Sequence, residues 1–198
     1  MRLISFPAGL KAAALGLAAF GLPAEAQLSE TRNLTIGWAE PAPEGSHWPE
    51  GIGGDLGARL EAAKDGWVIV DYWASWCGPC MGELKALNGA KPVYAEKGIT
   101  ILAANVDIAG RDTPVDVART VMKLSLDVLD PVLASGADID TMLAAVGETR
   151  KTASLPITIL YAPGGRPFAL LQQTGGIEAD SWTDPGMLAF FDELAGAE

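Results

Sequence analysis

An apolar segment that ends in a closely spaced pair of cysteines constrains this chain more than any other feature. The stretch VDYWASWCGPC, residues 70–80, contains both cysteines of the sequence, Cys77 and Cys80. The run WVIVDY at 67–72 is short, apolar and rich in β-branched residues, as is typical of a buried central strand. The residues after Cys80 have a helical composition. The pattern therefore predicts a strand, a Cys-x-x-Cys turn and a helix in succession.

The remaining segments indicate an α/β fold. Apolar runs and turn residues predict further strands at 34–38, 99–106, 128–133 (an edge strand, because of Pro131), 156–161 and 167–173. Periodicity and end signals predict helices at 55–64 (capped by Asp55), 81–87 (with a kink or resumption near Pro92), 114–124, 138–146 (ended by Gly147) and within 182–194 (starting at Asp184-Pro185). The first strands are expected to be parallel and the terminal hairpin antiparallel, which makes a mixed sheet flanked by helices.

The first 26 residues form a separate segment. Arg2 and Lys11 provide early positive charge, an apolar run covers 12–22, and Ala24-Glu25-Ala26 follows. This is the pattern of a secretory signal peptide with an A-x-A cleavage site. Spanning a bilayer requires about 20 residues, so an uncleaved membrane tether is the weaker alternative. We therefore expect a periplasmic protein, with 27–54 as an extended lead-in and 55–198 as the folded domain.

The charge balance argues against a nucleic-acid partner. The chain has 14 Lys and Arg against 25 Asp and Glu, a net charge of −11, and the acidic residues are scattered. Phosphate binding requires clustered basic residues, and the sequence has no such cluster. With 198 residues the chain can bury a substantial core, and we expect a soluble monomer.

The spacing of the cysteines favours redox chemistry. A disulfide between residues three apart closes too short a loop to stabilise the fold appreciably. Tetrahedral zinc requires four ligands, and the chain offers two Cys and one His, His47. Copper(I) can be held by two thiolates, so a copper-transfer module remains an alternative, as does a redox-inert structural protein. At the start of a helix the Cys77 thiol is expected to ionise easily and to be the exposed, attacking group. Cys80 is expected to be more buried and to resolve the mixed disulfide.

Asp71 is an unexpected residue in the apolar strand. Burial of a carboxylate is costly and raises its pKa. In an extended strand Asp71 would point inward beneath Cys80, where it could accept the proton of that thiol by general acid–base catalysis. The alternative is an aspartate at a solvent-exposed edge.

The stretch VDYWASWCGPC resembles the active-site strand and turn of thioredoxin-fold proteins. LPITIL at 155–160, followed by Gly164-Gly165, is similar to the cis-proline segment and hairpin of that family. The resemblance implies a thioredoxin-like fold and a cis peptide bond before Pro156 that faces the cysteines. It also implies substrate contacts by five residues: Trp76, Gly78, Pro79, Leu155 and Pro156.

Within that superfamily the chain resembles most the exported TlpA/ResA-like reductases. The signal sequence agrees, as does the long segment 109–152, expected to add a helix and a strand before the cis-proline strand. Glu83 matches a glutamate that this branch places beside its active site, which implies a role in proton handling; an exposed helix residue is the alternative. Lys85 stands where many members have proline, and Asp71 where the branch often has Asn, so the terminal domain of DsbD is a nearby alternative.

The expected function is that of a periplasmic thiol–disulfide oxidoreductase that acts mainly as a reductant through a mixed disulfide. Gly78-Pro79 between the cysteines resembles the strongly reducing members. The resemblance implies disulfide-bearing exported proteins as substrates, in cytochrome c maturation or at copper-site cysteines. It also implies a membrane electron donor of the DsbD/CcdA type. No cofactor and no resident metal are expected.

Overall fold

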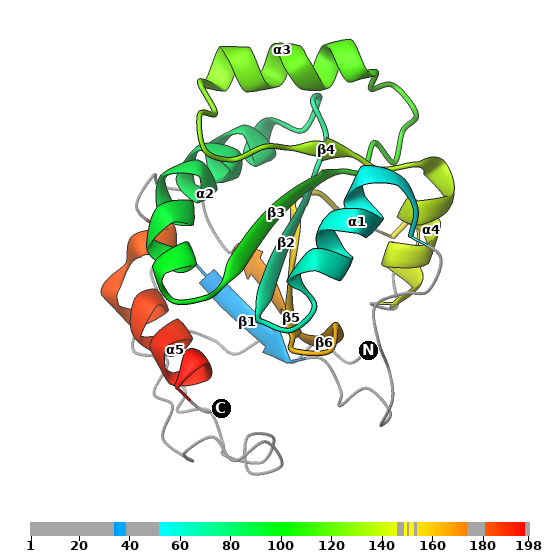
Figure 1. Cartoon of the computed structure of the whole chain (residues 1–198). Coiled ribbons are helices and arrows are strands. Elements are labelled where there is room, and N and C mark those ends of the chain that lie inside the picture. Colours follow the sequence, from blue (N-terminus) through cyan, green and yellow to red (C-terminus); the bar gives the residue numbers. More distant parts are fainter. Residues whose placement is uncertain are drawn as a thin grey trace.

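A six-stranded mixed sheet forms the centre of the computed structural model, which describes residues 34–38, 52–145, 149, 151–152, 154–173 and 181–196. The strands are β1 (Leu34–Trp38), β2 (Val68–Trp73), β3 (Thr100–Asn105), β4 (Val132–Leu133), β5 (Ile157–Ala162) and β6 (Arg166–Gln173). They are arranged in the order β1-β6-β5-β2-β3-β4 (Figure 1). β2, β3 and β4 are parallel, whereas β5, β6 and β1 join as antiparallel neighbours. The predicted mixed sheet is confirmed.

Helices cover both faces of this sheet. They are α1 (Gly54–Ala63), α2 (Gly78–Glu96), α3 (Pro114–Leu124), α4 (Gly136–Ala145), the short 3₁₀ helix η2 (Ser181–Thr183) and α5 (Pro185–Ala195). α2 and α5 lie on one side of the sheet, and α1 and α4 on the other, with α3 beyond the β4 edge (Figure 1). Between β3 and β5 the chain forms α3, β4 and α4, the helix, strand and helix that the sequence predicts for this segment.

Side-chain alternation along β2 divides the core into two clusters. Ile69 and Trp73 pack with α2 and α5, whereas Val68 and Val70 pack with α1 and α4. Because successive side chains of a strand point to opposite faces, Asp71 shares the face of Ile69 and Trp73. The carboxyl therefore points toward α2, as the sequence predicted.

Three helix starts differ from the prediction, and one of them is α4, which begins at Gly136 and not at Asp138. Gly53, not Asp55, is the N-cap of α1, and Asp55 lies in the first turn, where its carboxylate accepts a hydrogen bond from Arg59. Helix α2 begins at Gly78, because Cys77 is its N-cap and accepts the N–H of Cys80.

The later part of α2 and the β4 region also depart from the expected lengths. α2 continues unbroken through Asn88, Gly89 and the exposed Pro92, so the helix does not stop and resume there. β4 comprises only two residues after Pro131 and lies at the sheet edge, as expected of a strand that proline limits. The β5–β6 hairpin turns through Gly164 and Gly165, whose φ values of 82° and 75° suit glycine.

Several expectations concern residues outside the described ranges. They are the signal peptide at 1–26, most of the lead-in at 27–54, His47, and Gly147 as the end of α4. Within the described ranges, no helix combines the length and apolar character required to cross a membrane.

Candidate active site

Cys77 and Cys80 form a disulfide at the N-terminus of α2, with their Cα atoms 5.3 Å apart. The Sγ atom of Cys77 accepts a hydrogen bond from the backbone N–H of Cys80 at 3.3 Å. Cys77 is 4% exposed and Cys80 is fully buried. The expected order of exposure is confirmed, but the prediction of an openly exposed Cys77 is wrong. As N-cap, its side chain folds back over the first turn toward Cys80 and joins the core cluster.

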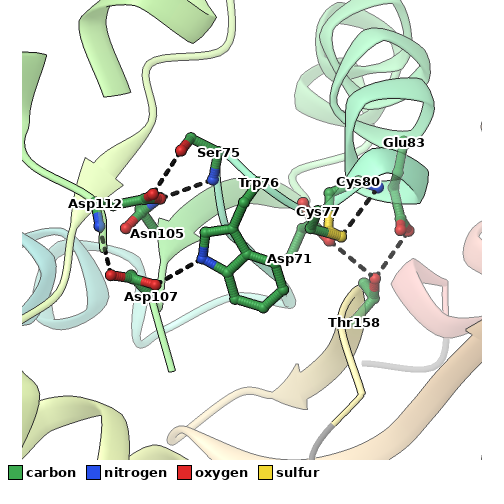
Figure 2. The surroundings of a disulfide bond; sticks show 10 residues. All are labelled: Asp71, Ser75, Trp76, Cys77, Cys80, Glu83, Asn105, Asp107, Asp112 and Thr158. Atoms are coloured by element: carbon green, nitrogen blue, oxygen red, sulfur yellow. Dashed lines mark hydrogen bonds between the residues drawn. A yellow bond between two sulfur atoms is a disulfide. The ribbon is translucent and has the colours of Figure 1, made fainter. Parts of the chain in front are cut away.

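A buried carboxyl pair lies beside this disulfide. Asp71 of β2 and Glu83 of α2 are 0% and 1% exposed. Thr158 stands opposite Asp71 in the antiparallel β2–β5 pairing. Its Oγ1 atom is 3.3 Å from Oδ1 of Asp71 and 2.9 Å from Oε1 of Glu83 (Figure 2). The alternatives of a solvent-edge Asp71 and an exposed Glu83 are therefore wrong.

Burial favours the protonated form of both carboxyls. Burial raises the pKa of Asp71 well above its ordinary value, and the charge of Glu83 adds to the rise. Burial raises the pKa of Glu83 from 4.5 to about 7, although the Thr158 hydroxyl and the indole of Trp182 oppose this rise. The second oxygen of each carboxyl is buried without a hydrogen bond in the part of the chain that the structure describes.

Exposed residues surround the disulfide where a partner chain could approach. Trp76 is 38% exposed, and Gly78 and Pro79 are exposed as well. A Cβ atom at Gly78 would meet nothing within 4 Å, so the fold itself does not require glycine there. The peptide bond between Leu155 and Pro156 is cis, as the resemblance implied, and both residues are half-buried before β5.

The loop after β3 holds the active-site turn in place. Asp112 accepts hydrogen bonds from the backbone N–H of Ser75 at 2.7 Å, from the Ser75 hydroxyl at 2.5 Å and from the Asn105 amide at 2.7 Å. Asp107 accepts the indole N–H of Trp76 at 2.7 Å and the backbone N–H of Asp112 at 2.5 Å (Figure 2). These bonds fix the residues that immediately precede Cys77.

The Asp107 carboxylate and the Arg111 guanidinium both contact the Trp76 ring system. Burial acts to raise the pKa of Asp107, but the hydrogen bonds that its carboxylate accepts outweigh burial and lower this pKa below its ordinary value. The Arg111 guanidinium lies 4.4 Å from the centre of the Trp76 ring, a cation–π contact. The turn thus presents an aromatic ring that is held by an anion at its edge and covered by a cation.

The arrangement of strand, cysteine turn and helix is matched by a known family. The model of the AhpC/TSA family matches residues 51–163, which is more than half of the chain. The chain belongs to the AhpC/TSA family. This match includes both cysteines, both buried carboxyls, the Asp107–Asp112 loop and Thr158.

Solved structures agree with the fold of this AhpC/TSA family member. A thioredoxin family protein described as a thiol:disulfide interchange protein, from Chlorobium tepidum, is 15% identical with a TM-score of 0.54. That comparison covers 77% of this chain and 98% of the other. The exposed lipoprotein thioredoxin of Streptococcus pneumoniae is 16% identical with a TM-score of 0.50 and covers 64% and 87%. The predicted thioredoxin-like fold is confirmed.

Curated relatives match a shorter part of the chain. The thiol-disulfide oxidoreductase ResA of Geobacillus thermodenitrificans is 35% identical over 65 residues, which is 31% of this chain and 37% of that protein. ResA of Geobacillus kaustophilus is 38% identical over 48 residues, or 24% and 28%. The chain thus matches about a third of the length of these curated relatives, and the predicted resemblance to ResA is confirmed over that part.

Three participants in the site of this AhpC/TSA family member were missed by sequence reasoning: Asp107, Asp112 and Thr158. The first two follow β3, which neighbours β2 in parallel. The carboxyl ends of neighbouring parallel strands lie at the same edge of a sheet. Two aspartates just after β3 therefore indicate acidic side chains close to the cysteine turn that follows β2. Thr158 had no such signal, since only the β2–β5 register brings it opposite Asp71.

The described residues contain no group of three or more His, Cys, Asp or Glu side chains placed to hold a metal ion. The copper-transfer alternative therefore depends on the thiols of Cys77 and Cys80 alone.

Proposed function

We propose that this protein is a thiol–disulfide oxidoreductase that exchanges its Cys77–Cys80 disulfide with protein substrates. The observation that supports this most strongly is the position of the disulfide, at the start of α2 and beside the buried pair Asp71 and Glu83. The ResA relatives, which are named as thiol-disulfide oxidoreductases, support the same reaction class.

Cys77 is the proposed nucleophile. A thiolate at a helix N-terminus is stabilised by unpaired backbone N–H groups and by the helix dipole. The Cys77 sulfur already accepts the N–H of Cys80 at 3.3 Å, a bond that would strengthen on ionisation. Since Cys80 is fully buried, the first attack belongs to Cys77 and the resolving step to Cys80.

The reduction of a substrate proceeds in two exchanges. The Cys77 thiolate attacks one sulfur of the substrate disulfide, and the other sulfur leaves as a thiolate and takes a proton from water. Cys80 then loses its proton and attacks the Cys77 sulfur, which forms the Cys77–Cys80 disulfide and releases the second substrate thiolate. Two electrons pass to the substrate, which ends as two thiols. Asp71 and Glu83 are the proposed acceptors of the Cys80 proton, and they return it to the second leaving thiolate.

The exposed turn and the cis-proline segment form the proposed substrate contact. Trp76, Gly78 and Pro79 surround Cys77 at the surface. Leu155 and Pro156 precede β5 and offer a backbone edge to an extended substrate.

The proposed physiological role is reduction of exported proteins in the periplasm by a monomeric protein with a cleaved signal peptide. The substrates are cysteine pairs of apocytochrome c or of a copper site, and the electrons come from a membrane donor of the DsbD/CcdA type. A reduction potential closer to the thioredoxin value of about −270 mV than to the DsbA value of about −120 mV is expected. A potential near the DsbA value would contradict the role of reductant.

Trapping with Cys80→Ser tests the reaction and names the substrate. Without the resolving thiol, Cys77 should retain its partner as a mixed disulfide, which mass spectrometry identifies after isolation from the periplasm of the native host. The matched control is Cys77→Ser, which should trap no partner. Absence of any adduct with Cys80→Ser, or equal trapping by both variants, would refute Cys77 as the nucleophile.

A further inference from the structure

The two buried carboxyls share one hydroxyl group. Thr158 Oγ1 lies within hydrogen-bond distance of both Asp71 and Glu83, at 3.3 and 2.9 Å. All three side chains are at most 2% exposed. Each comes from a different element, β2, α2 and β5, so the tertiary fold alone brings them together (Figure 2).

A hydroxyl carries one hydrogen, so it donates one hydrogen bond at a time, and it accepts through its lone pairs. Two ionised carboxylates would compete for that single hydrogen. If one carboxyl is protonated, it donates to Thr158 while Thr158 donates to the other, and both contacts are satisfied. The geometry is thus suited to a pair that holds one proton.

No described Lys or Arg compensates the charge of the pair, Asp71 and Glu83, through an ion pair. Trp182 of η2 faces Glu83, and Tyr72, the titratable neighbour of Asp71 on β2, packs in the other core cluster. Among the described residues, reduction of the Cys77–Cys80 disulfide adds two titratable thiols beside the pair.

We propose that Thr158 is a positioning residue that relays a proton between Asp71 and Glu83. In one arrangement the Asp71 carboxyl donates to Thr158 and Thr158 donates to Glu83. A concerted shift of two hydrogens along the same contacts moves the proton from Asp71 to Glu83 and reverses the direction of both bonds. No atom other than hydrogen has to move appreciably.

The relay deepens the proposed oxidoreductase function and rests on it. Asp71 can accept the Cys80 proton only while it is ionised. When Asp71 already holds the pair's proton, transfer through Thr158 to Glu83 restores the ionised form. After Cys80 attacks Cys77, the pair returns the accepted proton to the leaving substrate thiolate. The pair therefore gains and loses one proton in each turnover, and the balance closes without another reactant.

Two variants separate the hydroxyl from the bulk of the side chain. Thr158→Val removes the hydroxyl but keeps the β-branched shape that suits β5, and Thr158→Ser keeps the hydroxyl. The full-length, reduced protein is mixed with excess oxidised glutathione, and the first-order closure of the Cys77–Cys80 disulfide is followed from pH 5 to 9. We expect Thr158→Val to slow closure about tenfold near pH 7 and to move the pH profile to higher pH. Thr158→Ser should stay within about twofold of the wild type.

Carboxyl ¹³C NMR of the oxidised protein gives a second readout that needs no turnover. Because the hydroxyl contacts both carboxyls, Thr158→Val should move the titrations of both Asp71 and Glu83 to higher pH, and Thr158→Ser should leave both in place. A shift of only one carboxyl, or of neither, would overturn the shared contact.

The kinetic outcomes separate the relay from the reaction on which it depends. An unchanged pH profile in Thr158→Val, or an equal defect in Thr158→Ser, would overturn the relay while leaving the oxidoreductase function intact. If the wild type itself forms no Cys77–Cys80 disulfide with glutathione, the proposed function fails, and the relay fails with it.

Discussion

Replacement of Glu83 by glutamine should make the protein more stable at alkaline pH and leave its stability nearly unchanged at acidic pH. In the folded protein burial raises the pKa of Glu83 from 4.5 to about 7. The folded state therefore binds this proton more tightly than the unfolded state does. The stability that this provides is fully present below pH 4.5 and is lost as the pH rises through about 7.

The size of the effect follows from the same values. A pKa that rises from 4.5 to about 7 corresponds, at about 1.4 kcal/mol for each pKa unit, to about 3–4 kcal/mol of unfolding free energy. Glutamine has nearly the same shape and does not ionise, so the variant avoids this loss. The variant also removes the charge of Glu83, which helps to raise the pKa of Asp71. This second effect also makes the variant more stable than the wild type at alkaline pH.

Urea unfolding of the oxidised protein, followed by tryptophan fluorescence at pH 5, 6, 7 and 8, measures the difference directly. Glu83→Gln should gain on the wild type between pH 5 and about pH 7, and the difference should level off toward pH 8. Glu96→Gln is the matched control, because Glu96 is an exposed residue at the end of the same helix. A difference between Glu83→Gln and wild type that is constant from pH 5 to 8 would refute the assignment of a raised pKa to Glu83.

Two further predictions concern the turn before Cys77. Asp112→Ala should lower the unfolding free energy by about 2–4 kcal/mol, because Ser75 and Asn105 lose their shared acceptor in a partly buried position. Urea unfolding measures this loss, with the exposed residue Asp65 changed to alanine as the control. A loss of unfolding free energy no larger than that of Asp65→Ala would contradict the prediction. Trp76→Ala should lower the unfolding free energy by only about 1 kcal/mol, because the ring is 38% exposed. The rate of disulfide exchange of Trp76→Ala with a protein disulfide should fall several-fold more than its rate of exchange with oxidised glutathione. An equal fall in both rates would exclude a contact between Trp76 and the protein substrate.

Elements with strong local signals could be predicted from the sequence. Helix α3 begins and ends where expected, since Thr113 forms a capping box with Asp116 and Pro114 occupies the first turn. The sequence predicts that helix α2 begins at Met81, three residues after its actual start at Gly78. Its start depends on Cys77 as N-cap, and cysteine is not among the residues that normally signal a helix cap.

The buried carboxyls could be predicted in part. The two-residue period of β2 places Asp71 on the α2 face, and the helical spacing of α2 places Glu83 on the same side as Cys80. Whether Glu83 would be buried could not be decided from that spacing. Its burial depends on β5 and η2, which pack against α2 from more than seventy residues away in sequence.

Two sets of acidic residues meet at this turn, and hydrogen-bond donors separate their roles. Asp107 and Asp112 receive several N–H and O–H donors from the turn and from their own loop, and donors of this kind stabilise a carboxylate and anchor the loop. Asp71 and Glu83 share the single hydroxyl of Thr158, and burial with so few donors raises the pKa of both carboxyls. The sequence shows four carboxyls but not their donors, because the donors come from other strands and from backbone N–H groups. The supply of donors therefore decides which carboxyls fix the active-site turn and which can carry the proton that Cys80 must release.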